Sequence, residues 1–406
     1  MSTIIPPPRP NRPVYLDNQA TTRCDPRVLA VMLPWFSEHY GNPHSVEHVM
    51  GTEAESAAEE ARGHVAALIG AEAREVVFTS GATESNNIAI KGAARHALRS
   101  GSDRRRVITV ATEHKCVLES VADLQQEGFE AIFLQVRSDG LLDPDVLRDA
   151  LVVPTLLVSV MTVNNEIGVV QDIPTLAAIA KAAGALFHTD AAQGVGKVPI
   201  DVTAWKVDLL SLSGHKIYGP KGVGALYVRR RPRVRLVPLF SGGGQERGLR
   251  SGTLPAPLAI GLGEACRLAL AEMAEEATRI AALRARLLDR LHTALPEVRV
   301  NANMEARIPG NLNLTFPAVT AAELMARVPD LCVSTGSACS SAEIEPSYVL
   351  SALGLPPEEA ARSLRIGIGR FTSPADIDFA ANALAAAHAG MPTPAVGALP
   401  GAFPGA

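Results

Sequence analysis

The sequence predicts an α/β protein: a large domain built on a mostly parallel sheet, followed by a smaller α+β domain. Two observations predict the large domain. Seven β-rich runs alternate with helical stretches up to residue 230, and most of these runs are apolar throughout. Continuous apolar runs are typical of strands that are buried on both faces of a parallel sheet. The third observation is one long helical pattern near residue 257, after which strand-like runs resume.

The expected strands of the large domain are short. They cover residues 75–80, 106–112, 130–136, 155–164, 185–190, 207–213 and 224–230. A helix is expected over 45–70, with Gly70 as its C-terminal cap, because glycine readily adopts the left-handed conformation that ends helices. A later helix is bracketed by Asp172 and Gly184 in the same way. We therefore expect a sheet of about seven strands flanked by helices.

The long helix carries Ile280, Leu283, Leu287 and Leu291 at helical spacing. We expect it to bridge to the small domain, which contains strands at 311–316 and 363–369. The predicted divisions are a segment 1–25 that packs with the small domain, a large domain 26–265, a small domain 266–386 and a tail 387–406. That tail is rich in Ala, Pro and Gly, a composition typical of disorder.

Composition bounds the possible partners. The chain has 406 residues, 38 Lys plus Arg against 42 Asp plus Glu, and a formal net charge of −4. This balance gives no electrostatic reason to expect nucleic acid or a membrane as a partner. The arginines of residues 229–235 are interpreted as a solvated loop. The apolar run 151–163 is too short to span a bilayer.

The cysteines indicate the compartment. The five cysteines show no C-x-x-C pair and no metal-like spacing with histidine, so no metal site is predicted. Free thiols fit a reducing compartment, and the N-terminus lacks the pattern of a secretory signal. We therefore expect a cytoplasmic protein.

Polar clusters follow five of the predicted strands. They are SGATESNN (80–87), TEHK (112–115), NNEIG (164–168), HTDAAQ (188–193) and SGHKIYG (213–219). Ligands of open α/β sheets bind beyond the carboxyl ends of the strands. Five clusters at one edge of one sheet therefore predict a pocket.

Two residues in these clusters suggest its chemistry. Lys216 follows a buried strand, where an ammonium is rarely structural, and such a lysine commonly forms a Schiff base with an aldehyde. Asp190 ends the neighbouring run, where a carboxylate can hold a pyridinium nitrogen protonated. Alone, Asp190 could equally be a helix N-cap, and SGAT could be a capping turn rather than a phosphate site. Together, Lys216 and Asp190 indicate pyridoxal 5′-phosphate (PLP).

The chain resembles the group I cysteine desulfurases of the class V aminotransferase family. The matching segments run from YLDNQATT (15–22) to LRIGIGRFT (364–372), and SGHKIYGPKG, RSGT and GSAC form a specific combination. The resemblance implies the PLP-dependent transferase fold of type I and a homodimer. It also implies an activity: PLP-dependent conversion of L-cysteine to L-alanine, with the sulfur passed to Cys339 as a persulfide.

The resemblance also implies residue roles. Lys216 would hold the cofactor, Asp190 its ring nitrogen and Gln193 its phenolic oxygen, while His114 would stack on the ring and transfer protons. Asn165 and Arg365 would bind the substrate carboxylate. The phosphate would be held by the SGAT turn and by residues of two later motifs: Ala82, Thr83, Ser213, His215 and, from a second subunit, Thr253.

Cys339 differs from the other cysteines in its sequence setting. It lies in STGSACSSAE, a small-residue polar stretch typical of an exposed loop, where a thiol is accessible as a nucleophile. Cys116, Cys266 and Cys332 are interpreted as small buried hydrophobes. Cys116 directly follows His114 and Lys115, and we assign it no role.

Two alternatives stay open. One is selenocysteine lyase or another class V activity, and the other is a non-catalytic or nucleotide-binding module, for which no glycine-rich phosphate motif follows a strand. The sulfur acceptor, such as an iron–sulfur scaffold or an enzyme of tRNA or cofactor thiolation, is not specified by the sequence. The tail differs from that of many group I members, which dock such a scaffold there.

Overall fold

The computed structural model describes residues 13–336 and 347–390. Its central sheet has seven strands in the order β2-β8-β7-β6-β5-β3-β4. Strand β8 runs in the direction opposite to that of the other six strands. The bounds are β2 (Val76–Thr79), β3 (Arg106–Val110), β4 (Glu130–Leu134), β5 (Thr155–Ser159), β6 (Leu186–Asp190), β7 (Leu209–Ser213) and β8 (Gly224–Val228). The predicted mostly parallel sheet of seven strands is confirmed, with most strands ending earlier than expected.

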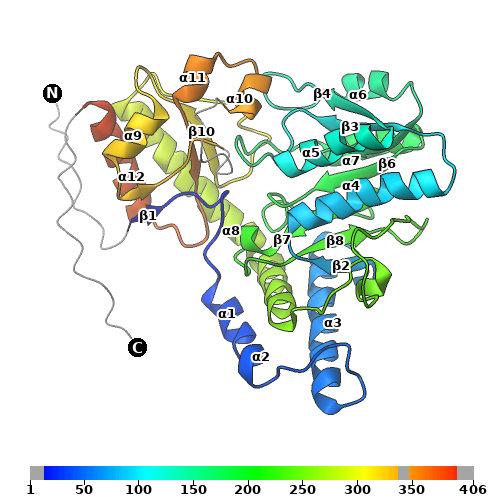
Figure 1. The fold of residues 1–406 in the computed structure, drawn as a ribbon. Helices are drawn as coiled ribbons and strands as arrows, with labels where there is room; N and C mark the ends of the chain where they lie inside the picture. The colour runs from blue at the N-terminus through cyan, green and yellow to red at the C-terminus, as the bar shows by residue number, and fades with distance from the viewer. Residues whose placement is uncertain (1–12, 337–346, 391–406) are drawn as a thin grey trace.

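Helices cover both faces of this sheet (Figure 1). They are α3 (Val49–Ile69), α4 (Ala82–Arg99), α5 (Lys115–Asp123), α6 (Pro144–Ala150) and α7 (Ile173–Ala182). Successive residues of a strand point to opposite faces, so Val76 and Phe78 join the core beneath α3 whereas Val77 joins the core beneath α4. Burial on both faces explains why these strands lack an apolar–polar alternation.

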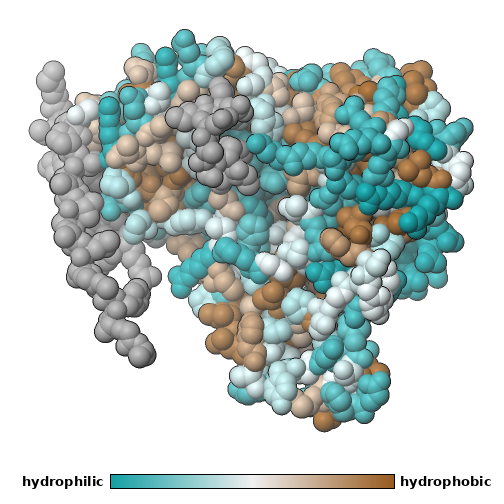
Figure 2. All heavy atoms as spheres, in the orientation of Figure 1, coloured by the Kyte–Doolittle hydropathy of each residue, from teal (hydrophilic) through white to brown (hydrophobic). Residues whose placement is uncertain are grey.

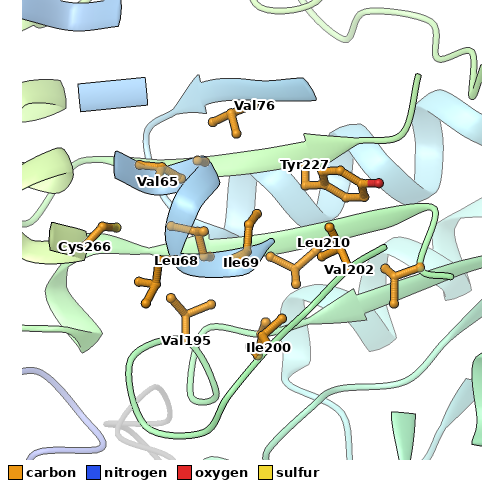
Figure 3. Packing of buried hydrophobic residues seen from close by; sticks show 14 of the residues in the cluster. Val65, Leu68, Ile69, Val76, Val195, Ile200, Val202, Leu210, Tyr227 and Cys266 are labelled. Carbon is orange, nitrogen blue, oxygen red and sulfur yellow. The ribbon is translucent and has the colours of Figure 1, made fainter. Parts of the chain in front are cut away.

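The core on the α3 side is closely packed. Figure 3 shows Val65 and Ile69 of α3 beside Leu210 and Tyr227 of the sheet, with Cys266 at the edge of the cluster. Helix α3 starts at Val49, later than expected, because the His48 side chain accepts a hydrogen bond from the Gly51 amide and so caps it. Gly70 ends it with φ 69°, as predicted.

Helix α8 (Ala256–Ala294) connects two cores. Its first half, up to Ala269, packs into the core of the large sheet, and Ile280, Leu283, Leu287 and Leu291 pack into a second core. Figure 1 shows this single helix running from the large sheet to the smaller domain. The change of core falls between Ala269 and Ile280.

The smaller domain has a three-stranded antiparallel sheet, β12-β10-β9. Its elements are β9 (Arg299–Val300), β10 (Asn311–Thr315), α9 (Ala321–Arg327), β11 (Leu331–Cys332), α10 (Tyr348–Ala352), α11 (Pro357–Ala361), β12 (Ser363–Gly367) and α12 (Pro374–His388). From the N-terminal segment, β1 (Val14–Tyr15) pairs with β11, and Val14 and Leu16 enter the second core.

The two ends of the described chain differ in how they pack. Ala387 and His388, which the sequence places at the start of the tail, instead complete α12, and Ala387 is fully buried. Residues 391–406 lie outside the described part. Near the other end, α1 (Pro26–Met32) and α2 (Pro34–Ser37) extend below the large sheet in Figure 1. Within the described ranges, no helix is long and apolar enough to cross a membrane.

Candidate active site

A cavity of about 480 Å³ opens at the carboxyl ends of the parallel strands. All five polar clusters predicted from the sequence contribute residues to it or to its immediate wall. Its lining includes Ser80, Gly81, Ala82, Thr83, His114, Asn165, Asp190, Gln193, Ser213, His215, Lys216 and Arg365. Because β2, β3, β5, β6 and β7 run in the same direction, the segments that follow them meet at one edge.

Lys216 lies in the short helix η3 (Gly214–Lys216), directly after β7. Its Nζ donates to the carbonyl oxygens of Gln19 and Ala20, each at 2.7 Å. The segment around residues 19–22 is held there by the same turn, since the Thr22 amide donates to the His215 carbonyl at 2.9 Å. The lysine amine therefore lies between the sheet edge and the N-terminal segment.

Asp190 ends β6 and its side chain is almost fully buried. Oδ1 accepts from the Ala192 amide at 2.9 Å, the capping contact that the sequence left open. Oδ2 accepts from Asn86 Nδ2 at 2.7 Å. The carboxylate thus caps a turn and also lines the cavity that contains Lys216, so the two interpretations are compatible.

The start of α4 forms one wall. Gly81, the N-cap, has φ 151° and no side chain, and Ala82 and Thr83 follow as the first helical residues. Amides of a first helical turn have no partner within the helix and attract anions. A Cβ on Gly224 of β8 would lie 2.6 Å from Gly81 Cα, so glycine at 224 permits this close approach of strand and turn.

The cavity lining carries more cationic than acidic side chains. Lys216, Lys221 and Arg365 line it, against the carboxylates of Glu84 and Asp190. Burial, followed by repulsion from Lys216 and other lysines, lowers the pKa of His215 to about 4, so its imidazole is neutral near pH 7. His215 Nδ1 lies 3.0 Å from Thr21 Oγ1. This surplus of positive charge suits an anionic ligand.

His114 is the N-cap of α5, and its Nδ1 accepts a hydrogen bond from the Cys116 amide at 3.2 Å. Burial lowers its pKa, with Asp190 acting in the opposite sense and Lys216 in the same sense. The ring is therefore neutral at physiological pH. Cys116 also lines the cavity, although the sequence assigned it no role.

Arg365 reaches the cavity from β12 of the small domain. Its Nη1 donates to the Asn165 carbonyl at 3.0 Å and its Nη2 to Asp17 Oδ1 at 2.8 Å. Its Nε and the side-chain oxygen of Asn165 have no partner among the described residues. A buried donor of this kind is available to a carboxylate ligand.

Of the predicted site residues that the structure describes, Thr253 alone is not brought into this cavity. Thr253 is exposed and is not among the lining residues. Cys339 lies in 337–346, outside the described residues. The described residues on either side of that stretch both contact Glu166: Ser347 Oγ donates to its Oε2 at 2.5 Å, and a Cβ on Gly336 would lie 2.6 Å from the same oxygen.

Sequence reasoning missed several supporting residues. They are Asp17 beside Arg365, the Gln19 and Ala20 carbonyls beside Lys216, Asn86 beside Asp190, and Lys197, whose Nζ donates to Gln193 Oε1 at 2.7 Å. Asp17 and Asn86 stand within polar motifs, which was an available signal. Lys197 and the two carbonyls carry no such signal, because only the fold brings them to the site.

Comparison with known proteins identifies the family of this chain. The family described as "Aminotransferase class-V" matches residues 14–379. The chain therefore belongs to the class V aminotransferase family, whose members depend on PLP.

Within that family, the relatives are cysteine desulfurases. A protein named mitochondrial cysteine desulfurase, from Arthroderma benhamiae, is 56% identical over 374 residues, which are 92% of this chain and 74% of that protein. The cysteine desulfurase IscS of Rickettsia bellii is 53% identical over 91% of this chain and 89% of its own length. A solved NifS-like protein superposes with a TM-score of 0.85 at 35% identity, covering 92% of this chain and 98% of that one. The resemblance found in the sequence and the predicted fold are confirmed.

Proposed function

We propose that this protein is a cysteine desulfurase that converts L-cysteine to L-alanine and transfers the sulfur to Cys339. The observation that carries the proposal is one cavity that holds the Lys216 amine, the Asp190 carboxylate and the Arg365 guanidinium, each supplied by a different strand or strand end. The amine suits the aldehyde of a cofactor, and the carboxylate suits that cofactor's basic ring nitrogen. The guanidinium suits the carboxylate of a substrate. The relatives' names supply the substrate.

The residues present fit PLP. Asp190 suits its ring nitrogen, and Gln193 its phenolic oxygen. The first turn of α4, with Ala82 and Thr83, suits its phosphate, together with Ser213 and His215. Lys216 would hold the aldehyde carbon. When bound, the cofactor supplies an electron sink for a carbanion at the substrate's Cα.

The protein's own groups would then act in order. Arg365 Nε and the side-chain amide nitrogen of Asn165 donate to the substrate carboxylate, and Lys216 takes the Cα proton. The Cys339 thiolate attacks the substrate sulfur, so a sulfur–sulfur bond forms and the bond between sulfur and Cβ breaks. Protons return to the substrate carbons. The balance is one cysteine and one thiol giving one alanine and one persulfide, with no external oxidant or reductant.

Delivery of the thiol is supported by the described chain ends. Ser347 donates a hydrogen bond to Glu166, which adjoins Asn165, and Gly336 lies so close to the same carboxylate that a Cβ there would clash with it. Ser334 forms a β-bridge with Arg365. The stretch that carries Cys339 thus joins the described structure at the cavity's substrate side. An acceptor such as an iron–sulfur scaffold and a cytoplasmic location both remain predictions made from the sequence.

A homodimer, with Thr253 completing the partner's phosphate site, is also part of the proposal. Its support is an exposed apolar surface around α1 and α2, visible in Figure 2 as brown spheres where these helices lie. The exposed side chains are Leu29, Val31, Leu33, Phe36, Tyr40, Val46 and Val49. A contiguous apolar surface of this kind is typical of protein interfaces.

The test uses the purified protein with PLP and L-cysteine. We expect a visible absorption band from the lysine-linked cofactor, stoichiometric alanine and sulfide under a reductant, and a persulfide on Cys339. Lys216→Ala should lose the covalent band and all turnover, and Cys339→Ser should lose sulfide release. Cys332→Ser, outside the cavity, is the matched thiol control. Turnover by Cys339→Ser with selenocysteine but not cysteine would indicate the lyase instead.

A further inference from the structure

We propose that Asn86 and Cys116 are positioning residues that hold His114 as the tautomer protonated on Nε2, so that His114 serves the reaction as a neutral hydrogen-bond donor. This rests on the proposed desulfurase function. It assigns roles to two residues for which the sequence gave none, and it narrows the role expected for His114.

The first link is Asn86, which is fully buried in α4. Its Nδ2 donates to Asp190 Oδ2 at 2.7 Å and lies 3.2 Å from Cys116 Sγ. A carboxylate only accepts hydrogen bonds, so the amide nitrogen and not the amide oxygen must face Asp190. Both amide hydrogens are then used, one by Asp190 and one by the sulfur of Cys116.

The second link is the thiol of Cys116. Burial, and then the nearby Asp190 carboxylate, raise its pKa to about 12, so the thiol keeps its proton throughout the physiological range. Its sulfur accepts from Asn86, and the Thr83 hydroxyl also hydrogen-bonds to it. His114 Nδ1 lies 3.0 Å from the same sulfur and is an acceptor for the S–H proton.

The third link fixes the imidazole. The backbone amide of Cys116 can only donate, and it points at His114 Nδ1 from 3.2 Å as the N-cap bond of α5. Nδ1 therefore presents its lone pair, and the proton of the neutral ring resides on Nε2. Protonating Nδ1 would break the cap, because the new N–H would face two other donors, the Cys116 amide and the Cys116 thiol. His114 therefore cannot exchange protons through this atom.

The surrounding charges do not override this arrangement. Asp190 and Glu119 favour the protonated ring, whereas Lys216 and Lys115 oppose it, and burial is the largest influence and also opposes it. A neutral ring that already carries its proton on Nε2 donates from that atom and does not accept there. Removal of the Cα proton thus remains with Lys216, and His114 supplies a hydrogen bond to ligands in the cavity.

This series of hydrogen bonds also connects two parts of the site. Asp190 is the residue suited to the cofactor's ring nitrogen, and its Oδ2 is joined through the Asn86 amide and the Cys116 thiol to Nδ1 of His114. Replacing Asn86 or Cys116 should therefore alter His114 without removing any side chain that is proposed to bind substrate.

The experiment compares the holoenzyme with Cys116→Ala, Cys116→Ser and Asn86→Ala. Loss of the thiol donor leaves Nδ1 with the backbone amide alone, which makes the ring easier to protonate. For Cys116→Ala we expect kcat to fall roughly three- to tenfold, the effect of one neutral hydrogen bond, with KM for cysteine little changed. The acidic limb of the pH profile should move to higher pH. Cys116→Ser, whose hydroxyl can still donate, should recover most of both changes.

A direct readout is the ¹⁵N spectrum of histidine-labelled holoenzyme, with His114 assigned by His114→Gln. We expect a non-protonated Nδ1 and a protonated Nε2 in the wild type, and a changed Nδ1 resonance in Cys116→Ala. Cys332→Ala is the matched control and should match the wild type in both measurements.

The outcomes separate the two proposals. If the wild type releases no alanine from cysteine, the proposed function is wrong. If the wild type is active but shows a proton on Nδ1, or if Cys116→Ala keeps the wild-type pH profile and Nδ1 resonance, the positioning role is overturned.

Discussion

Arg365, which lines the cavity, forms an ion pair with Asp17, with Nη2 2.8 Å from Oδ1. Arg365 comes from β12 of the small domain and is 2% exposed, while Asp17 belongs to the N-terminal segment. Two of the guanidinium nitrogens are thus committed to protein oxygens, and Nε is the nitrogen without a described partner. The protein holds the fork in place before any substrate carboxylate binds it.

This arrangement predicts the effect of Arg365→Lys. An ammonium keeps the charge but cannot contact Asp17, Asn165 and a carboxylate in one plane. We expect KM for cysteine to rise roughly tenfold or more, with a smaller change in kcat, since a charge-assisted hydrogen bond contributes about 1.5–3 kcal/mol. Steady-state kinetics measure this. Arg286→Lys, which alters an exposed pair with Asp378, is the control. An unchanged KM in Arg365→Lys would contradict the assignment.

Lys197 predicts a second effect, on cofactor binding. Its Nζ donates to Gln193 Oε1 at 2.7 Å, while Gln193 Nε2 donates to the Gln19 carbonyl at 2.8 Å. These contacts direct the amide NH₂ of Gln193 toward the cavity. In Lys197→Met the amide can turn over, so we expect PLP to bind roughly three- to tenfold more weakly, as for one lost hydrogen bond. Fluorescence titration of apoenzyme checks this, with Lys206→Met as the exposed control.

Much of this architecture is predictable because it depends on local patterns. The seven apolar runs become strands with two buried faces, and each polar cluster lies where a strand ends, so the edge of the sheet follows from strand direction alone. The sequence places Lys216 and Asp190 at this edge for the same reason, and both line the cavity. The second half of the long α8 is also encoded locally, in the spacing of its apolar residues.

The contacts that complete the site are not predictable in this way. Asp17 meets Arg365 across 348 positions of sequence, and Asn86 meets Asp190 across 104. Neither spacing leaves a periodic signal, and both contacts exist only after the N-terminal segment and α4 have docked. The start of α3 shows the same limit on a small scale, since the His48 imidazole caps it where the usual capping residues would be Ser, Thr, Asp or Asn.

His188 predicts how stability depends on pH. It is fully buried in β6, with its two ring nitrogens 2.8 and 3.0 Å from the hydroxyls of Ser159 and Ser211. Burial lowers its pKa to about 3, below the ordinary 6.5. Between pH 6.5 and about 3, His188 is protonated in the unfolded chain but not in the folded protein. The free energy of unfolding therefore falls as the pH drops from about 6.5 toward 3.

The size of this effect is measurable. From pH 7 to pH 5, His188 alone should lower the free energy of unfolding by roughly 2 kcal/mol. Denaturant titrations at the two pH values check this. His188→Gln should show a flatter pH dependence, although it is less stable at pH 7, and exposed His39→Gln should behave as the wild type. An equal pH dependence in His188→Gln would show that other groups dominate.

Glu246 fixes the loop that leads to Thr253. Its carboxylate accepts two hydrogen bonds from Arg62 of α3, at 2.7 and 2.9 Å, and one from the Phe78 amide of β2 at 2.8 Å. Both ion-pair partners are buried, and Arg62 also lies over the Phe78 ring, 4.6 Å from its centroid. Removing Glu246 would leave the buried Arg62 charge with the exposed Glu59 as its remaining acidic partner.

Glu246→Gln should therefore lower the free energy of unfolding by roughly 3–5 kcal/mol. Glu59→Gln removes a second, exposed partner of the same arginine and should change it by less than about 1 kcal/mol. If Thr253 completes the phosphate site of a second subunit, Glu246→Gln should also weaken PLP binding, whereas Glu59→Gln should not. Denaturant unfolding and PLP titration of both variants measure the two effects, and equal losses in the pair would contradict the special position of Glu246.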